Sequence, residues 1–246
     1  MHPIGLFTDF GVAGPYLGQV RGVLLEQAPG APVLDLMADA PAFHPQAAAY
    51  LLAALVPEWP KSMVVVAVVD PGVGGDRLPL IVEVDGRWFV GPDNGLFEML
   101  LRRADHWRCW AVTWRPSRLS ASFHGRDLFA PVAARLAQGE PPERIGARRV
   151  EPFRPGDWPD DLAEVVYVDC YGNVMTGVRA SQVADTTLVR VGASRLGRAG
   201  TFSDHPVGMP FWYENSIGLL EVAVNQGSAS TVLKLDVGKK IALENV

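Results

Sequence analysis

Asp70, Arg77 and His124 are side chains of the three types that can activate a water molecule together. Asp70 follows directly on a run of apolar, mostly β-branched residues, Val64 to Val69, and a proline and three glycines lie between it and Arg77. An arginine stabilises an oxyanion, while a carboxylate and an imidazole orient a water and accept its protons. Two plainer interpretations are open: Asp70 caps its own turn after a core strand, and His124 caps a helix.

Two other kinds of site use similar residues. Carboxylates and a histidine can bind a cation. We nevertheless expect no metal site, because the chain has no His-x-x-x-His pattern or clustered cysteines and Arg77 would repel a cation. A phosphate loop is excluded, since the segment Asp70-Pro-Gly-Val-Gly-Gly lacks the Gly-Lys-Ser/Thr ending and begins with an acid.

Alternating strands and helices must position these side chains. Apolar runs at 4–8, 32–37 and 64–69 predict strands, and the patterns at 15–27 and 45–56 predict the helices between them. This βαβαβ order is typical of a doubly wound sheet, which binds ligands at the carboxyl ends of its strands. We therefore expect the polar loops at Asp9, Asp70, Asn94 and His124 to converge on one edge of the sheet.

The rest of the chain changes character after Glu140. Before it, Asp85-Gly86 predicts a hairpin between strands 78–84 and 87–90, followed by a helix at 96–103, a strand at 109–114 and a helix ending near 138. Prolines then mark a linker, and short runs of Val, Leu and Thr predict a small all-β barrel or sandwich. The expected fold is α/β: a Rossmann-like α/β sandwich domain over residues 1–150 and a smaller all-β, barrel-like domain over residues 160–246.

Composition narrows the class of protein. The chain is 48% hydrophobic with a net charge of −5, so it indicates a compact globular protein and gives no basic face for nucleic acid. Met1 runs straight into a strand-like segment without a signal peptide, and no apolar run is long enough to cross a membrane. Cys109 and Cys170 lie in different predicted strands, so we expect no disulfide and a cytoplasmic location.

Six polar segments occur in a fixed order and resemble those of the S-adenosyl-L-methionine (SAM) hydroxide adenosyltransferases. These enzymes hydrolyse SAM to adenosine and methionine, and they are relatives of the SAM-dependent fluorinase and chlorinase. The resemblance covers nearly the whole chain. The segments are Thr8-Asp9-Phe10-Gly11, Val69 to Gly74, Gly91 to Gly95, Phe123 to Asp127, Asp169 to Asn173, and Ser216-Ile217-Gly218 with Asn225 to Ala229.

The resemblance implies roles for particular residues. Asp70, Arg77 and His124 match the family's water-activating triad. Asp9 matches the carboxylate that holds the ribose hydroxyls, and Phe43 an aromatic residue near the sugar. The remaining substrate-binding positions are Asn94, Asp169 at the methionine ammonium, Asn173 at adenine, Ser216 at the methionine carboxylate, and Phe202 stacked on adenine, with Phe211, Trp212 or Tyr213 as alternatives for that stack.

The resemblance also implies a homotrimer, with SAM bound between the N-terminal domain of one subunit and the C-terminal domain of its neighbour, and no cofactor. Two positions depart from the family. Gly14 replaces an acid that the family usually carries before its Pro-Tyr, and Ile217 stands where the halogenating relatives have an arginine. The methionine end of SAM would then depend more on Ser216 and backbone amides.

Two further functions compete with hydrolysis. The first is chloride transfer to C5′; the halogenases that the chain resembles carry a tyrosine at the position of Asp70, lack His124 and have an inserted loop after the third strand. An ionised Asp70 would also repel a halide ion. The second is a non-catalytic protein that binds SAM or adenosine, and the presence of all three triad residues speaks against it.

Overall fold

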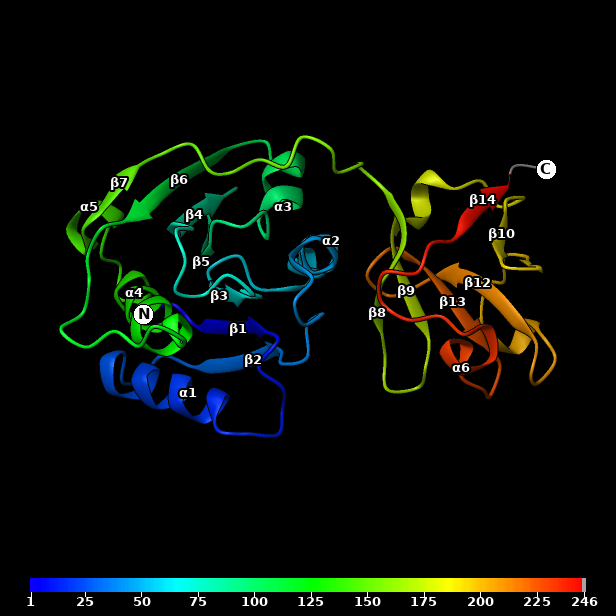
Figure 1. The fold of residues 1–246 in the computed structure, drawn as a ribbon, viewed down its shortest axis with the longest axis horizontal. Coiled ribbons are helices and arrows are strands. Elements are labelled where there is room, and N and C mark those ends of the chain that lie inside the picture. The colour runs from blue at the N-terminus through cyan, green and yellow to red at the C-terminus, as the bar shows by residue number, and fades with distance from the viewer. Residues whose placement is uncertain (245–246) are drawn as a thin grey trace. The chain divides into compact units, whose positions relative to one another are not determined.

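The computed structural model describes residues 1–244 of the chain, which divides into two compact units (Figure 1). Unit 1 comprises residues 1–52 and 59–156. Unit 2 comprises residues 53–58 and the chain from 157 onward. Unit 1 thus ends within the proline-rich stretch of the sequence.

Unit 1 is built on a mixed seven-stranded sheet with the order β2-β1-β3-β5-β4-β6-β7. The first four strands in this order run parallel, and β4 and β7 run antiparallel to their neighbours. The βαβαβ start that the sequence predicts is confirmed. The strands are β1 (Ile4–Thr8), β2 (Val33–Met37), β3 (Val64–Val68), β4 (Pro79–Val84), β5 (Arg87–Pro92), β6 (Trp107–Val112) and β7 (Ala147–Arg149).

Helices α1 and α4 share one hydrophobic core with the sheet. Leu17, Val20 and Leu24 of α1 are buried together with the apolar residues of α4 and with Ile4 and Val64. All five residues of β3 are buried, as expected for a central parallel strand. The helices of unit 1 are α1 (Tyr16–Gln27), α2 (Pro45–Leu55), whose last residues, from Ala53, belong to unit 2, α3 (Glu98–Arg103), α4 (Ala130–Ala137) and α5 (Pro142–Ile145).

The hairpin between β4 and β5 has the turn that its sequence predicts. Asp85 and Gly86 both have positive φ, 46° and 82°, which is the geometry of a type I′ turn. The next strand differs: β6 spans Trp107–Val112 rather than 109–114, because Trp107 pairs with Val84 while Thr113 donates to the backbone oxygen of Gly146. The helix expected after His124 begins with a π-helical turn, η2 (Gly125–Phe129), before α4.

Unit 2 is an all-β barrel with short helical turns. Two sheets, β12-β13-β9-β8 and β11-β10-β14, pack on one core that contains the fully buried Trp212. Backbone hydrogen bonds join the sheets at both edges: Val165 donates to the oxygen of Lys239, and Ala199 donates to that of Trp212. The strands are β8 (Leu162–Val168), β9 (Val174–Arg179), β10 (Leu188–Val191), β11 (Ser194–Leu196), β12 (Pro210–Glu214), β13 (Leu219–Val224) and β14 (Ala242–Glu244).

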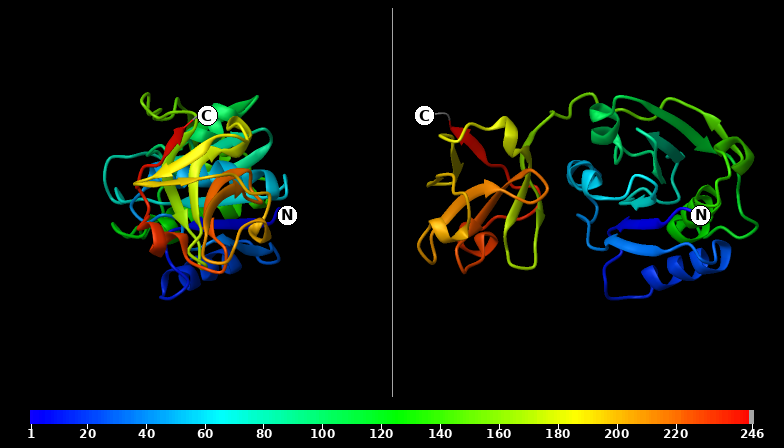
Figure 2. Two further views of the ribbon diagram at one scale, coloured as in Figure 1. Left: turned by 90° about the vertical axis from the view of Figure 1, so that its right-hand side faces the viewer. Right: turned by 180° about the vertical axis from the view of Figure 1, so that it is seen from behind.

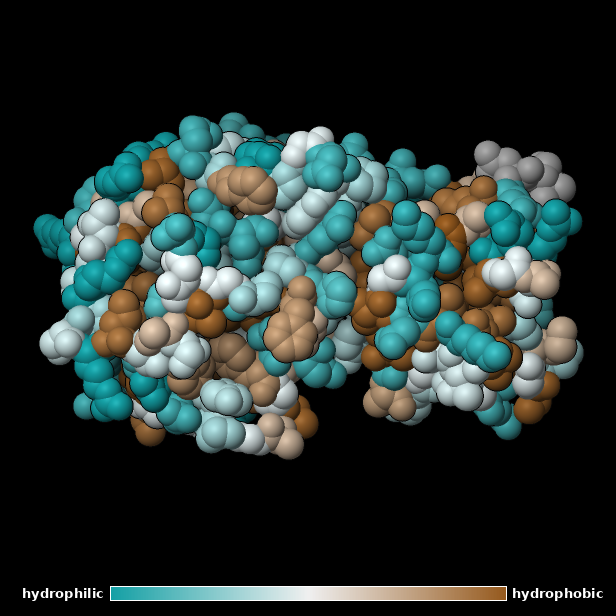
Figure 3. All heavy atoms as spheres, in the orientation of Figure 1, coloured by the Kyte–Doolittle hydropathy of each residue, from teal (hydrophilic) through white to brown (hydrophobic). Residues whose placement is uncertain are grey.

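These bonds link the two sheets through segments next to their edge strands, in agreement with the barrel-like domain that the sequence predicts (Figure 2). The turns η1 (Val56–Glu58), η3 (Ala180–Gln182), η4 (Phe202–Asp204) and helix α6 (Ala229–Leu233) complete unit 2. Polar and apolar residues are intermixed on the visible surface (Figure 3). In the described part of the chain, no helix has the length and hydrophobicity needed to cross a membrane.

Candidate active site

Unit 1 has a cavity of about 330 Å³ at the carboxyl ends of β1 and β3. Asp9 follows β1 and Asp70 follows β3, so the two parallel neighbours bring their carboxylates to one edge of the sheet. His124 and Phe43 also line this cavity. Of the four polar loops predicted to converge here, those of Asp9, Asp70 and His124 do so.

Arg77 lies between Asp70 and His124. Its Nε is 3.2 and 3.0 Å from the two carboxylate oxygens of Asp70, and one terminal nitrogen also pairs with that carboxylate. The same terminal nitrogen is 2.9 Å from Nδ1 of His124. The side chains of Asp70 and Arg77 are only 4% and 10% exposed, so this ion pair is little screened by water.

The contact with Arg77 determines the protonation of His124. A guanidinium group only donates hydrogen bonds, so Nδ1 must accept and the neutral imidazole carries its proton on Nε2. Burial, followed by the positive charge of Arg77, lowers the pKa of His124 below its usual 6.5. His124 is therefore neutral at pH 7 and presents an Nε2–H donor.

Backbone contacts hold the two loops that carry the triad. Gly74 has φ +81°, and a Cβ there would collide with the backbone oxygen of Ala121 in the segment before His124. Asp127 accepts a hydrogen bond of 2.7 Å from the backbone N–H of Ser120, which fastens that segment to the π-helical turn. The ring of Phe129, on the same turn, lies 5.4 Å from the guanidinium carbon of Arg77.

Asn94 lines neither this cavity nor the cavity of unit 2. Its Nδ2 donates to the backbone oxygen of Val69 at 2.9 Å, and its Oδ1 accepts from the N–H of Leu96 at 3.2 Å. Val69 directly precedes Asp70, so the structure gives Asn94 a contact that supports the end of β3. Its predicted contact with substrate stays a prediction.

Asp9 and Phe43 lie close together at the mouth of the unit 1 cavity. Burial raises the pKa of Asp9, although hydrogen bonds from its own backbone and that of Phe43 oppose the shift. Phe43 has φ +64° and is 76% exposed, an unusual combination for a large aromatic residue. Such a strained, exposed ring beside a carboxylate is typical of a ligand contact.

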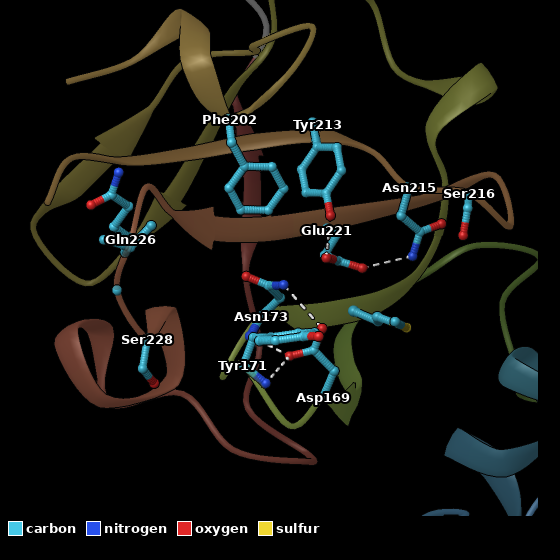
Figure 4. Close-up of a pocket in the computed structure, with 13 residues that line it drawn as sticks. Asp169, Tyr171, Asn173, Phe202, Tyr213, Asn215, Ser216, Glu221, Gln226 and Ser228 are labelled. Carbon is cyan, nitrogen blue, oxygen red and sulfur yellow. Dashed lines mark hydrogen bonds between the residues drawn. The ribbon is translucent and has the colours of Figure 1, made fainter. Parts of the chain in front are cut away.

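Unit 2 has its own cavity, of about 840 Å³, on the face of the sheet that carries β12, β13 and β9 (Figure 4). Four of the predicted substrate-binding residues line it: Asp169, Asn173, Phe202 and Ser216. Asp169 accepts hydrogen bonds from the backbone N–H groups of Tyr171 and Asn173 at 2.9 and 2.8 Å, and from Nδ2 of Asn173 at 3.0 Å. This loop between β8 and β9 is thus held by its own carboxylate.

The structure narrows the aromatic candidates for stacking on adenine. Phe211 and Trp212 are fully buried, so neither presents a face to the cavity. Phe202 and Tyr213 both line it, with ring centroids 5.3 Å apart and planes at 66°. Of the four candidates, Phe202 and Tyr213 alone remain.

Glu221 is a cavity residue that the sequence analysis missed. It lies on β13 opposite Tyr213, accepts hydrogen bonds from the Tyr213 hydroxyl and from Nδ2 of Asn215, and is 2% exposed. Burial raises its pKa. The sequence feature that could have identified Glu221 is that it is a single acid within the otherwise apolar strand Leu219–Val224.

Within residues 1–244 no group of three or more His, Cys, Asp or Glu is arranged to hold a metal ion. Asp70 and His124 line the unit 1 cavity, and the guanidinium of Arg77, which does not itself line it, bonds both of them from behind the cavity wall. The arrangement suits the positioning and deprotonation of a small neutral molecule such as water.

Two family models match the chain. The model described as SAM hydroxide adenosyltransferase N-terminal domain matches residues 4–146, and the corresponding C-terminal domain model matches residues 163–242. Together they cover most of both units.

Relatives of known name match over nearly the whole chain. A protein from Thermus thermophilus named (R)-S-adenosyl-L-methionine hydrolase is 40% identical, over 99% of this chain and 100% of its own length. A protein of the same name from Salinispora arenicola is 37% identical, over 97% and 96%. Among solved structures, an uncharacterised conserved protein from Thermotoga maritima aligns with a TM-score of 0.88 at 31% identity, covering 98% of this chain and 100% of that one.

Proposed function

Because this chain belongs to the SAM hydroxide adenosyltransferase family, we propose that it hydrolyses S-adenosyl-L-methionine to adenosine and L-methionine. The observation that carries the proposal is the joining of Asp70, Arg77 and His124 at the carboxyl end of β3. The relatives' names specify the R configuration at sulfur, and we propose the same epimer as the substrate here.

The reaction is an in-line displacement at the ribose C5′. The oxygen of water forms a bond to C5′ while the bond from C5′ to sulfur breaks, and the electron pair of that bond stays on sulfur as the neutral thioether of methionine. Water gives up one proton, through Asp70 to solvent. No cofactor is needed, because the sulfonium is already an activated leaving group.

The triad positions the water. Oδ2 of Asp70 accepts from two nitrogens of Arg77, whereas Oδ1 accepts from Nε alone and retains an acceptor site to which a water O–H can donate. The Nε2–H of His124 donates to the water oxygen, and the guanidinium of Arg77 stabilises the negative charge that develops there. His124 thus acts in this state as an orienting donor, and Asp70 accepts the proton.

The remaining contacts follow the family resemblance. Asp9 holds the ribose hydroxyls, and Phe43 covers the sugar. In unit 2, Asp169 meets the methionine ammonium, Asn173 reads adenine, Ser216 contacts the methionine carboxylate, and Phe202 stacks on the base, with Tyr213 as the alternative. Each of these six side chains lines one of the two cavities.

We further propose a homotrimer in which the N-terminal domain of one subunit and the C-terminal domain of its neighbour enclose SAM. The proposal rests on the family resemblance. A cytoplasmic location is proposed with it, since Cys109 and Cys170 are both free thiols.

The experiment uses purified protein, SAM and ¹⁸O-labelled water. We expect equal amounts of adenosine and methionine, with the label in the 5′-hydroxyl of adenosine and faster turnover of the R sulfonium epimer. Formation of 5′-chloro-5′-deoxyadenosine in chloride buffer would instead establish halide transfer. Binding of SAM without any product would establish a non-catalytic binding protein.

A further inference from the structure

The unit 2 cavity carries acidic side chains without basic ones. Its lining contains two carboxylates, Asp169 and Glu221, and no lysine, arginine or histidine. The bonds to Asp169 come from backbone N–H groups and an amide, and those to Glu221 come from a hydroxyl and an amide. Within residues 1–244, neither carboxylate forms an ion pair with a basic side chain.

Glu221 is the more unusual of the two. It is 98% shielded from solvent, because 2% of its surface is exposed, and its position on β13 places it between Tyr213 on β12 and Met175 on β9. Burial raises its pKa, with a smaller contribution from the negative charge of Asp169, while the hydrogen bonds from Tyr213 and Asn215 oppose the shift; within residues 1–244 no positive group acts with them. Leaving a carboxylate buried without a cation costs free energy, so such a group is typical of a site where a ligand supplies the charge.

The bonds to neutral donors leave Glu221 able to accept more. A carboxylate offers about four acceptor sites, and Tyr213 and Asn215 occupy one on each oxygen. Figure 4 shows the Glu221 carboxylate between the Tyr213 ring and the Asn215 amide, on the side of the cavity that faces Asp169 and Asn173. The network therefore fixes the direction of the carboxylate without neutralising it.

We propose that Glu221 determines the charge specificity of this site, selecting adenosyl compounds whose sulfur is a sulfonium cation over the corresponding neutral thioethers. The inference rests on the proposed function, because it takes the adenosyl sulfonium as the ligand. SAM carries one more positive charge than S-adenosyl-L-homocysteine, from which it differs by the methyl group on sulfur. Methionine, the product, is also a neutral thioether, so the same selection would favour its release after the reaction.

The test compares the wild type with Glu221→Gln, which keeps the shape and one acceptor oxygen but removes the charge. Dissociation constants for SAM, S-adenosyl-L-homocysteine and adenosine are measured by titration calorimetry, and chromatography of the same samples follows adenosine release. Glu214→Gln is the matched control. Glu214 is the last residue of β12, the strand next to that of Glu221; it is exposed and does not line the cavity.

We expect Glu221→Gln to weaken SAM binding at least about tenfold, since a contact between opposite charges in a protein site is stronger than in water, while the homocysteine analogue and adenosine change less than threefold. KM should rise while kcat stays unchanged or increases, because the sulfonium charge that Glu221 would stabilise is present in the ground state and is being lost in the transition state. Glu214→Gln should behave as the wild type.

Three results would overturn this proposal. They are equal binding of SAM and its neutral analogue by the wild type, an unchanged preference in Glu221→Gln, or a parallel loss of adenosine affinity, which would mean that Glu221 only supports the cavity wall. The proposed function fails separately, if the wild type binds SAM but releases no adenosine. In that case the preference for SAM over the analogue still decides the role of Glu221.

Discussion

Arg77 joins the two other members of the triad and stacks near Phe129. Replacing it by alanine removes the donor for the developing oxyanion and leaves the Asp70 carboxylate buried without its partner. We expect Arg77→Ala to lower kcat at least about a hundredfold, the loss typical of one oxyanion donor, with SAM binding largely retained. Steady-state kinetics and calorimetry measure the two effects.

Arg21→Ala is the control for this variant, because Arg21 is 49% exposed and forms its ion pair with Asp35 on β2. It should keep wild-type kcat. If Arg77→Ala also keeps wild-type kcat, Arg77 has no part in the reaction.

Protonation of His124 should limit the activity of the protein at acidic pH. Burial and Arg77 lower its pKa below 6.5, so the folded protein holds the neutral form where the unfolded chain is already protonating. We expect the free energy of unfolding to decline as pH falls below about 6.5, where the unfolded chain takes up the proton, and kcat to decline only at lower pH, through the lowered pKa of His124 in the folded protein. Protonation would place an N–H on Nδ1 against the guanidinium and break the contact of 2.9 Å.

A pH–rate profile of the wild type and of His124→Asn checks this prediction. The asparagine variant should lose activity and also lose the part of the acidic decline that His124 causes. An identical acidic limb in both proteins would assign the decline to another group.

Individual residues of the site were predictable to different degrees. Asp70, Arg77 and His124 meet as expected, because a carboxylate at a strand end and a histidine at a helix start have positions set by local sequence. The sequence pattern did not identify Glu221, since only the pairing of β12 with β13 brings the Tyr213 hydroxyl to its carboxylate. Asn94 has the motif of the family, but its amide bonds the backbone at Val69 instead of facing the cavity.

At the scale of elements, the loop after β3 must approach the segment before η2 very closely. Gly74→Ala should disturb this approach, because its φ of +81° disfavours a side chain and the new Cβ would meet the oxygen of Ala121. We expect a loss of about 1–3 kcal/mol in the free energy of unfolding and at least a tenfold loss of kcat, as Arg77 and His124 move apart. Thermal unfolding and steady-state assays measure both.

Gly18→Ala is the matched substitution. Gly18 lies on the exposed side of α1, where a Cβ would have no neighbour within 4 Å, and its φ is not positive. Alanine there should leave kcat unchanged and stabilise the helix by up to about 1 kcal/mol. Equal behaviour of the two variants would contradict the close-approach argument.

The strands and main helices of unit 1 follow from hydrophobic pattern and turn residues, as the Asp85-Gly86 hairpin illustrates. Exact ends follow from tertiary pairing instead. β6 starts at Trp107 because that residue pairs with Val84. The π-helical turn was not foreseen either; it brings Gly125 so close to the Phe10 ring that a Cβ there would clash, a contact between distant parts of the chain.

At the scale of the whole molecule, the α/β class and the all-β second unit were predictable, since the change from helical to strand periodicity is local. The link between the two sheets of that unit was less so, because one of the bonds that make it joins Val165 to Lys239, which are far apart in sequence. Assembly with other copies leaves no local pattern at all, and the trimer is therefore a matter for experiment.

Mixed trimers test whether active sites form between subunits. Arg77→Ala damages only the unit 1 cavity and Asp169→Asn only the unit 2 cavity, so neither variant alone should turn over SAM efficiently.

The two variants are co-expressed with different affinity tags. Assemblies that carry both tags are purified, and their mass is measured by light scattering. Three times the 26.6 kDa of one chain is the expected mass. If unit 1 of one copy meets unit 2 of the next, each trimer that carries both variants has one site of three with two intact cavities, and activity at low SAM should return to about a third. If each site belongs to one subunit, every site carries a substitution and the mixed assemblies remain inactive, which would rule out the shared site.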